Sequence, residues 1–480
     1  MILHYNLSSK DSCLKNQTEP IQAEPLFTPR QPRKESPPLE TIEYRNPNSQ
    51  PVDGQDDVEN SSRLSADISY PEGGLQAWIV VFGSFCAMGA VFGLINTSAV
   101  FESYFKENQL SAYTHSEIGW IFSLYLFLVF FVGILVGPIF DRFGPRLLVG
   151  AGSILIVLSL MLLSLSKDYY QIVLTYSVMG GIGGALLNCP AYGAIAHFFN
   201  KRRGLATGIA FTAGGIGGII FPLLLQFLLA DQGVGFGWSC RIMGFIMLIL
   251  CGLANLCIRS RLSSANAKGE EVKLSSVLPD VTILRNKGFA MAALGIFFME
   301  WGLFVPLTYI VSYAKSHGNG DAASSVLLSI LNAGSVLGRF LPGLVADKLG
   351  RFNVIIVTIG LCVTTILAMW LPSGHSKSTL MAFCILFGFA SGSNLGLTPV
   401  CIGQFCDSRD YGRYVTTANM IASFGTLSSV PIGGALLGLG EQTTGWMALI
   451  IFSGVSYVVA MVCYMYARVS VTGLKLQAIF

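Results

Sequence analysis

Apolar and polar positions fall along this chain in long blocks. From Leu75 onward, stretches of about 20 residues with almost no charge recur, and a helix needs about 20 apolar residues to cross a bilayer core. A helix satisfies its own backbone hydrogen bonds in lipid, so each block predicts a membrane span. We expect twelve spans, at residues 76–101, 117–138, 146–166, 171–196, 204–229, 236–258, 288–313, 322–346, 353–371, 378–403, 413–438 and 445–467.

The composition agrees with this pattern. Hydrophobic residues make up 52% of the chain and charged residues 12%, whereas a soluble domain carries about a quarter charged residues. The longest and most polar connection between spans, residues 259–287, falls between the sixth and the seventh. The expected fold class is therefore an all-α integral membrane protein with twelve transmembrane helices in two bundles of six.

Polar segments also mark the expected regions of the chain. The N-terminal residues are rich in Pro, Ser, Asn, Gln and acidic side chains, and are too polar to bury a core. We expect a disordered cytoplasmic tail at 1–70, an N-terminal six-helix bundle at 71–258, a cytoplasmic central loop at 259–287, a C-terminal six-helix bundle at 288–468 and a cytoplasmic tail at 469–480.

Basic residues gather in the even-numbered loops between the expected spans. Lys201, Arg202 and Arg203 form an unbroken run in the fourth loop. The positive-inside rule places the even loops and both termini in the cytoplasm, so we interpret this run as a topology anchor. The plasma membrane is the expected location, with the vacuolar membrane as the alternative.

An internal repeat links the two expected bundles. The stretch "GPIFDRFGPR" after span two is echoed by "GLVADKLGRF" after span eight, with Gly, Asp, a basic residue and Gly at the same offsets. Two related halves with a binding site between them are typical of secondary transporters.

The repeated loop motif resembles the one that follows helix two in the major facilitator superfamily. The stretch "YPEGGLQAW" before span one is similar to a motif of the monocarboxylate-porter branch, in a form that looks fungal. The fourth-loop motif of that branch is matched by Phe199, Lys201, Arg202, Arg203, Leu205, Ala206, Gly208 and Ala210. The resemblance covers about residues 70–470 and implies a twelve-helix transporter that works by alternating access.

The chain also departs from the branch it resembles. Leu75 replaces a tryptophan of the first motif, and Ala213 replaces a usual glycine. Asn96 stands where proton-coupled members carry a lysine, and Ser335 where they carry an aspartate, although the arginine of helix eight is retained as Arg339. These departures argue against lactate-type proton symport.

The two copies of the loop motif are candidate gating elements. The resemblance implies that they latch the cytoplasmic helix ends in the outward-open state. Ion pairs that form in one conformation only bias a two-state equilibrium. The alternative is that the cations merely fix topology, but the repeated aspartate has no role under the positive-inside rule. The gating candidates are Asp141, Arg142, Arg146, Asp347, Lys348 and Arg351.

Arg339 is the first candidate for substrate binding. It lies inside an apolar run, where a charged side chain faces protein or a water-filled cavity and marks a functional site. Asn332 and Ser335 precede it by seven and four residues and share its helical face. In the alternative, Arg339 reaches the cytoplasmic interface or closes a structural ion pair.

Glu300 is a second charged residue deep within an expected span. An ionised carboxylate in hydrocarbon is unfavourable, so we expect it to be paired, protonated or hydrated. Two roles follow for Glu300: it carries protons during transport, or it forms an ion pair with Arg339. Further polar candidates for the transport route, each equally explained by hydrogen bonds between helices, are Asn96, Asn188, Tyr309, Asn394 and Asn419.

Several classes of function are excluded. No basic stripe carries the interleaved aromatics of a nucleic-acid site. The glycine pairs at 180–184 and 214–218 neither follow a strand nor end in the Lys-Ser/Thr of a phosphate-binding loop, so no nucleotide is expected and close helix packing explains them. Eleven cysteines lack metal-ligand spacing. We expect no metal, no cofactor and no enzymatic activity.

The expected function is secondary-active transport of a small organic molecule across the bilayer, with protons as a candidate coupling ion. An organic anion or a secondary metabolite is the leading substrate, exported by an efflux pump of a biosynthetic cluster. Uptake of a monocarboxylate or a riboflavin-like nutrient is the alternative. A non-transporting membrane sensor is the alternative from another class.

Overall fold

The computed structural model describes residues 69–230, 233–262, 280–318, 321–438 and 442–473. These residues belong to one compact unit, Arg63–Phe480. The expected tail at 1–70 and the central part of the loop at 259–287 lie almost wholly outside the described residues, as does the end of the tail at 469–480. The described part of the chain is helical and holds no strand.

Twelve helical spans are long and apolar enough to cross a membrane, as predicted. Each agrees with an expected span, although the first runs on to Glu107, and Arg351 begins a helix where a loop residue was expected. The helices of the first six spans are α2 (Leu75–Ile95), α3 (Ser98–Glu107), α4 (His115–Phe131), α5 (Gly133–Phe143), α6 (Arg146–Leu163), α7 (Tyr169–Ile172), α8 (Gly180–Phe198), α9 (Arg203–Leu229) and α10 (Phe236–Cys257). The last six are α11 (Lys287–Ser316), α12 (Asp321–Leu349), α13 (Arg351–Thr365), α14 (Lys377–Ile402), α15 (Tyr411–Leu437) and α16 (Gln442–Thr472).

Four spans change geometry along their length, and the second of the twelve divides into α4 and α5 at Val132. In the first, Asn96 Nδ2 donates to the carbonyl of Phe92 at 2.7 Å and Thr97 Oγ1 to that of Leu94 at 2.6 Å. Such bonds compete with the helical backbone ladder, and the span breaks there into α2 and α3. The fourth and ninth spans each include a π-helical stretch, at Val173–Met179 and Ile366–Trp370.

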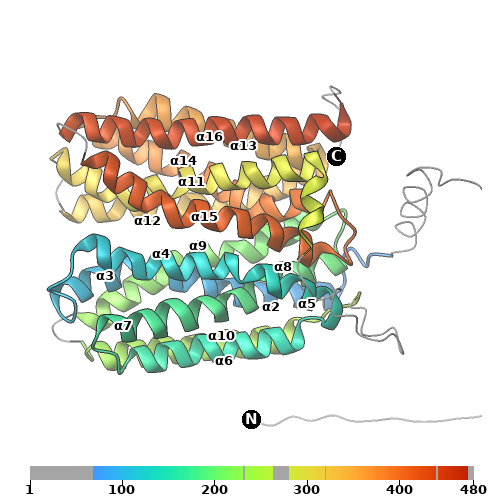
Figure 1. Ribbon diagram of the computed structural model, residues 1–480, viewed down its shortest axis with the longest axis horizontal. Coiled ribbons are helices and arrows are strands. Elements are labelled where there is room, and N and C mark those ends of the chain that lie inside the picture. Colours follow the sequence, from blue (N-terminus) through green and yellow to red (C-terminus); the bar gives the residue numbers. More distant parts are fainter. Residues whose placement is uncertain (1–68, 231–232, 263–279, 319–320, 439–441, 474–480) are drawn as a thin grey trace, which may run out of the picture. The chain divides into compact units, whose positions relative to one another are not determined.

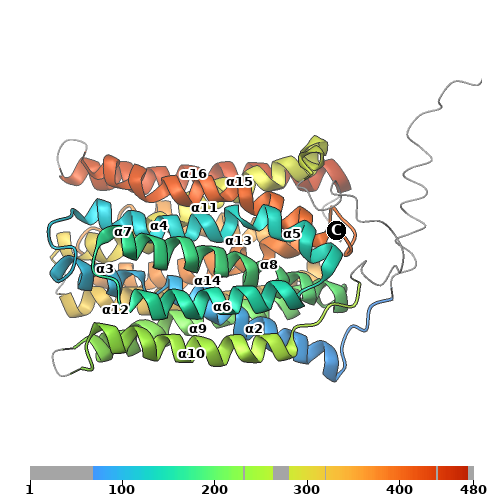
Figure 2. The same ribbon diagram turned by 60° about the horizontal axis from the view of Figure 1, so that its bottom comes forward.

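The helices form two groups that lie side by side (Figures 1 and 2). Helices α2 to α10, blue to green in Figure 1, make up the first group, and α11 to α16, yellow to red, the second. The groups meet along two seams: α9 packs against α12, and α4 and α5 pack against α15. These seams decide which side chains of one group reach the other.

Large apolar side chains cover the outside of the helices. Leu147, Phe227 and Val357 are 78%, 76% and 71% exposed, which in water would be unfavourable but suits contact with lipid tails. Many polar side chains are instead buried inside, among them Asn188, Glu300 and Arg339. The inside of this protein therefore holds the groups able to carry function.

The seam between α9 and α12 depends on glycine. A Cβ added to Gly214 would lie 2.6 Å from Nη1 of Arg339, and one added to Gly208 would overlap the backbone carbonyl of the same residue. The second glycine pair of the sequence thus serves close contact between helices, as expected.

Candidate functional site: a central cavity beneath a closed face

The two copies of the repeated aspartate make reciprocal contacts between the groups. Asp141, in the last turn of α5, accepts hydrogen bonds from the backbone N–H groups of Gly412 and Arg413, both at 2.8 Å. Asp347, near the end of α12, accepts from Gly204 and Leu205, both at 2.9 Å. Each carboxylate therefore caps the positive N-terminal end of a helix in the other group.

We call the end of the protein where these caps lie the even-loop face, because the second, fourth, eighth and tenth loops meet there. Arg351 lies 3.7 Å from Asp347 and also donates to the carbonyl of Asn200 in the first group. Arg142 is half-buried, while Arg146 and Lys348 are exposed. Asp141, Asp347 and Arg351 therefore join the two groups in the described conformation.

Arg203 differs from its two neighbours in the predicted topology anchor. Lys201 and Arg202 are exposed, but Arg203 is only 2% exposed. Its Nη2 donates to Oγ of Ser408 at 2.8 Å, and its guanidinium lies 5.3 Å from the ring centre of Tyr411. Arg203 therefore belongs to the contact between the groups, a role that a rule based on counting cations does not predict.

Ser408, in the tenth loop, contacts three side chains from the first part of the chain. Its backbone carbonyl lies 3.0 Å from Nε2 of His197, and its hydroxyl lies 2.9 Å from the hydroxyl of Tyr70 as well as bonding Arg203. Three side chains of the first part of the chain thus hold one loop of the second group. The even-loop face is closed by these bonds together with the two aspartate caps.

The motif before the first span docks onto the fourth loop. Glu72 accepts hydrogen bonds from the backbone N–H groups of Asn200, Lys201 and Arg202 at 2.7–3.1 Å. The ring of Trp78 packs on that of Phe199 at 5.3 Å. Glu72 and Asn200 lie 128 positions apart, so two distant motifs of the sequence form one structure. Glu72 holds a positive φ of 51°, a strained conformation that these bonds stabilise.

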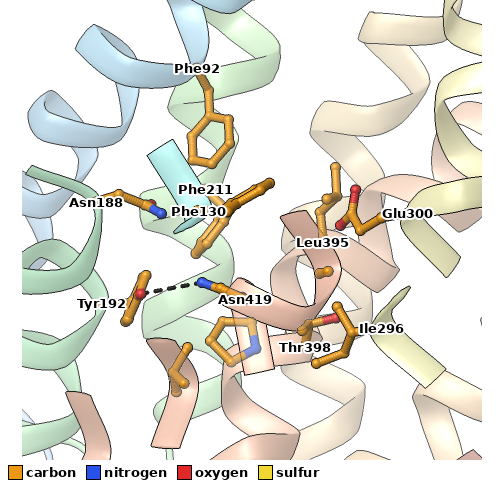
Figure 3. A pocket seen from close by; sticks show the side chains of 13 residues that line it. Phe92, Phe130, Asn188, Tyr192, Phe211, Ile296, Glu300, Leu395, Thr398 and Asn419 are labelled. Carbon is orange, nitrogen blue, oxygen red and sulfur yellow. Dashed lines mark hydrogen bonds between the residues drawn. The ribbon is translucent and has the colours of Figure 1, made fainter. Parts of the chain in front are cut away.

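A second layer lies beneath the closed face. Asn419 Nδ2 on α15 donates to the hydroxyl of Tyr192 on α8 at 3.4 Å. The ring of Tyr192 meets that of Tyr411 edge-on, with centroids 6.2 Å apart. This pair joins the two groups and lines a cavity on the side of the closed face (Figure 3).

The cavity lies between the two groups, and the space between its wall atoms is about 420 Å³ when the open solvent at its mouth is counted. Aromatic rings and aliphatic side chains make up most of its wall, and a few amide, hydroxyl and carboxyl groups interrupt them. The lining residues are Phe92, Phe130, Asn188, Tyr192, Phe211, Ile296, Glu300, Leu395, Thr398, Pro399, Val415, Asn419 and Ala422. Apolar walls interrupted by a few polar groups are typical of small-molecule sites.

Two polar side chains of this wall have buried atoms without a partner. Asn188 is 3% exposed and Glu300 5% exposed, and neither Oδ1 of Asn188 nor Oε2 of Glu300 has a hydrogen-bond partner. They come from different groups, α8 and α11, and Figure 3 shows them on opposite sides of the cavity. Buried polar atoms are nearly always bonded, so these two are suited to a ligand.

Arg339 does not line this cavity. It is 8% exposed, and its Nη1 donates to the carbonyl of Phe211 on α9 at 2.7 Å. Asn96 donates to the carbonyl of Gly214 at 3.2 Å, and Asn332 to that of Gly218 at 3.3 Å. Three predicted ligands of the substrate thus bond to carbonyls on successive turns of α9.

The proposed ion pair between Glu300 and Arg339 is not formed within the described residues. The guanidinium is held at the seam with α9, whereas the carboxyl group lies in the cavity without a charged partner. The ion-pair reading of Glu300 is therefore wrong for this conformation. An ionised carboxylate is unfavourable in such a site, which favours the protonated acid.

The remaining candidates lie at contacts between helices. Tyr309 donates to the carbonyl of Val430 at 2.8 Å. Asn394 accepts from Oγ1 of Thr358 at 2.7 Å. Ser335 is buried where α12 packs on Gly392 of α14. The sequence offered no signal for the aromatic wall, because phenylalanine in an apolar span looks the same whether it faces lipid or a cavity.

Twelve spans in two groups, a cavity lined from both groups and a face closed by reciprocal caps define a membrane transporter. The sequence profile of the Major Facilitator Superfamily matches residues 77–426. The chain belongs to this superfamily. Its narrower assignment to the monocarboxylate-porter branch stays a prediction.

Characterised relatives cover most of the chain. It is 35% identical to the riboflavin transporter MCH5 of Saccharomyces cerevisiae, over 85% of this chain and 81% of that protein. It is 34% identical to the fujikurins efflux protein of Gibberella fujikuroi, over 91% of this chain and 92% of that protein. The fold is shared with the crystal structure of the fucose:proton symporter FucP of Escherichia coli, with a TM-score of 0.64 and 16% identity, over 82% of this chain and 99% of that one.

Proposed function

We propose that this transporter exports an organic secondary metabolite by alternating access and leaves the molecule chemically unchanged. The pair of reciprocal aspartate caps is the observation that carries the proposal. Each cap joins one helix group to the other, so both must break when the even-loop face opens. Contacts that form in only one of two conformations set how much of each is populated. A substrate that binds the two conformations unequally then shifts this balance.

The even-loop face is proposed to lie in the cytoplasm of a plasma-membrane protein, with both termini on that side. The excess of basic residues in the even loops supports this orientation. The described conformation is then closed towards the cytoplasm. The proposed regions of the chain are those expected from the sequence, with two six-helix bundles at 71–258 and 288–468.

Glu300 is proposed to couple transport to protons. It lines the cavity, is buried, and has no cation beside it in the described part of the chain. A carboxyl group in this position holds its proton while the site is dry and releases it when water or a charged partner reaches it. A proton gradient then supplies the energy for export.

Uptake of a riboflavin-like nutrient is the second candidate function. The similarity to a riboflavin transporter favours it, whereas the similarity to an efflux protein favours export. Monocarboxylate uptake has less support, because Asn96 and Ser335 replace the ionisable residues of the porters and Arg339 lies outside the cavity wall.

The test is export from proteoliposomes loaded with a mixed library of riboflavin, lactate, pyruvate and uncharged fungal metabolites. Mass spectrometry of the retained contents, with and without a pH gradient, identifies any compound that leaves. Protein-free liposomes and an Asp141→Asn/Asp347→Asn variant reconstituted to the same level are the controls. Retention of every compound at the protein-free level, as a non-transporting sensor requires, overturns the proposal.

A further inference from the structure

We propose that the central cavity takes a flat, uncharged molecule carrying an amide-type group, in which a carbonyl and an N–H lie side by side, as in a lactam, a pyridone or an imide. The inference rests on the proposed function and narrows its substrate class. It assigns Asn188 and Glu300 as the two polar contacts of that molecule.

The chemistry of these two side chains sets the polar requirement. A primary amide offers both donors and an acceptor, and a protonated carboxyl group offers one donor and remaining acceptor capacity. Oδ1 of Asn188 and Oε2 of Glu300 are buried and unpartnered. A ligand group that donates and accepts at adjacent atoms satisfies either side chain, whereas a group that only accepts leaves Oδ1 of Asn188 without a donor.

The aromatic wall sets the shape requirement. Phe92, Phe130 and Phe211 line the same cavity as the two polar groups, and Figure 3 shows rings of Phe130 and Phe211 between Asn188 and Glu300. Rings pack best against other rings in offset or edge-on arrangements. A flat conjugated molecule packs against these rings between Asn188 and Glu300 and presents its polar edge to one or both of these side chains.

The charge of the site excludes an organic anion in this conformation. No Lys or Arg lines the cavity among the residues that the structure describes. Arg339, the nearest candidate from the sequence, has its Nη1 bonded to the carbonyl of Phe211. An anion beside Glu300 would be buried without a compensating cation, which is strongly unfavourable. A cation would need an ionised Glu300 to balance its charge. Oδ1 of Asn188 would then still need a hydrogen-bond donor from another part of the ligand.

Four flat three-ring probes of similar size separate these alternatives. Lumichrome is uncharged and carries an imide, 1,3-dimethyllumichrome lacks its N–H groups, anthracene-2-carboxylate is an anion and 9-aminoacridine is a cation. Binding to the purified full-length chain in lipid nanodiscs is measured by fluorescence titration at pH 7. We expect lumichrome to bind at least tenfold more tightly than each of the other three. Equal or tighter binding of any of them, or no binding of lumichrome, overturns the assigned class.

Variants test the two side chains. Glu300→Leu and Asn188→Leu should each weaken lumichrome binding more than tenfold. Glu300→Gln keeps a donor beside an acceptor and should bind within threefold of the natural chain. Thr364→Val, an exposed site on α13, is the matched control for handling and folding. If Glu300→Gln loses binding as fully as Glu300→Leu while remaining folded, the hydrogen-bonding role of Glu300 is wrong.

The two proposals fail in different ways. Export of any compound from the loaded liposomes, together with no binding of lumichrome, rejects the substrate class and keeps the transport function. Binding of lumichrome with no export of any compound rejects the transport function and keeps the substrate class.

Discussion

Asp141 and Gly412 lie 271 positions apart in the chain, yet the carboxylate of the first accepts a 2.8 Å hydrogen bond from the backbone N–H of the second. The bond joins the end of the second span to the start of the eleventh. Asp347 makes the equivalent bond to Gly204 at the start of the fifth span. The internal repeat of the sequence thus becomes a pair of equivalent contacts on one face.

Removing a cap should open this face. In Asp141→Asn, the side-chain NH₂ replaces one of the two oxygens that accept from the N–H groups of Gly412 and Arg413. A hydrogen bond to a charged group contributes about 1.5–3 kcal/mol. We expect the population of the closed state to fall by about tenfold or more. Spin labels at the exposed Arg146 and Lys348, on a cysteine-free background, should show a longer distance between the groups. An unchanged distance distribution would show that the cap does not hold the face closed.

A single methyl group should obstruct the same contact. A Cβ at Gly412 would lie 2.6 Å from Oδ1 of Asp141 and 2.9 Å from the carbonyl of Gly137. Gly412→Ala is therefore expected to reduce export by at least tenfold with normal insertion, measured in proteoliposomes. Gly252→Ala on α10, where no atom lies within 4 Å, is the control and should export normally. Normal export by both variants contradicts the gate.

Loss of Arg339 should separate binding from transport. Arg339→Ala removes the bond to the carbonyl of Phe211 and leaves space beside Gly214, so the seam between α9 and α12 is weakened. We expect export to be lost while lumichrome binding changes less than threefold. A variant that inserts normally but loses lumichrome binding as fully as Glu300→Leu would instead make Arg339 a direct ligand.

Glu300→Gln should remove the response to a pH gradient. The amide cannot gain or lose a proton in this range, although it keeps the hydrogen-bonding pattern of the protonated acid. Export by the natural chain is expected to rise with the gradient, and export by the variant to stay constant. The measurement is the initial rate of efflux from liposomes with and without the gradient. A variant that still follows the gradient rules out Glu300 as the coupling group.

Glu72 should stabilise the fourth loop. Its carboxylate holds three backbone N–H groups just before α9, in the manner of a helix cap. We expect Glu72→Ala to lower the free energy of unfolding by about 1–2 kcal/mol, detected as a lower melting temperature in detergent. Glu107→Ala, an exposed acid at the end of α3, is the matched control and should melt like the natural chain.

The sequence by itself determined the twelve spans and the pairing of the two loop motifs. Span length and apolar content are local properties, so they are legible without knowing any neighbour. The aspartates could be named as gate candidates because the repeat places them at equivalent positions in both halves. Their partners could not be named, because Gly412 and Gly204 offer only backbone N–H groups.

Only the tertiary structure decided which polar side chains face the cavity. Asn188 and Glu300 do, whereas Arg339, Asn96 and Asn332 bond to carbonyls of α9. The sequence could not tell which of the five line the cavity, since each is a polar or charged residue within an apolar span. The direction of a side chain depends on how its helix is rotated against its neighbours, and that rotation is set by close packing at glycine-rich seams between segments far apart in the chain.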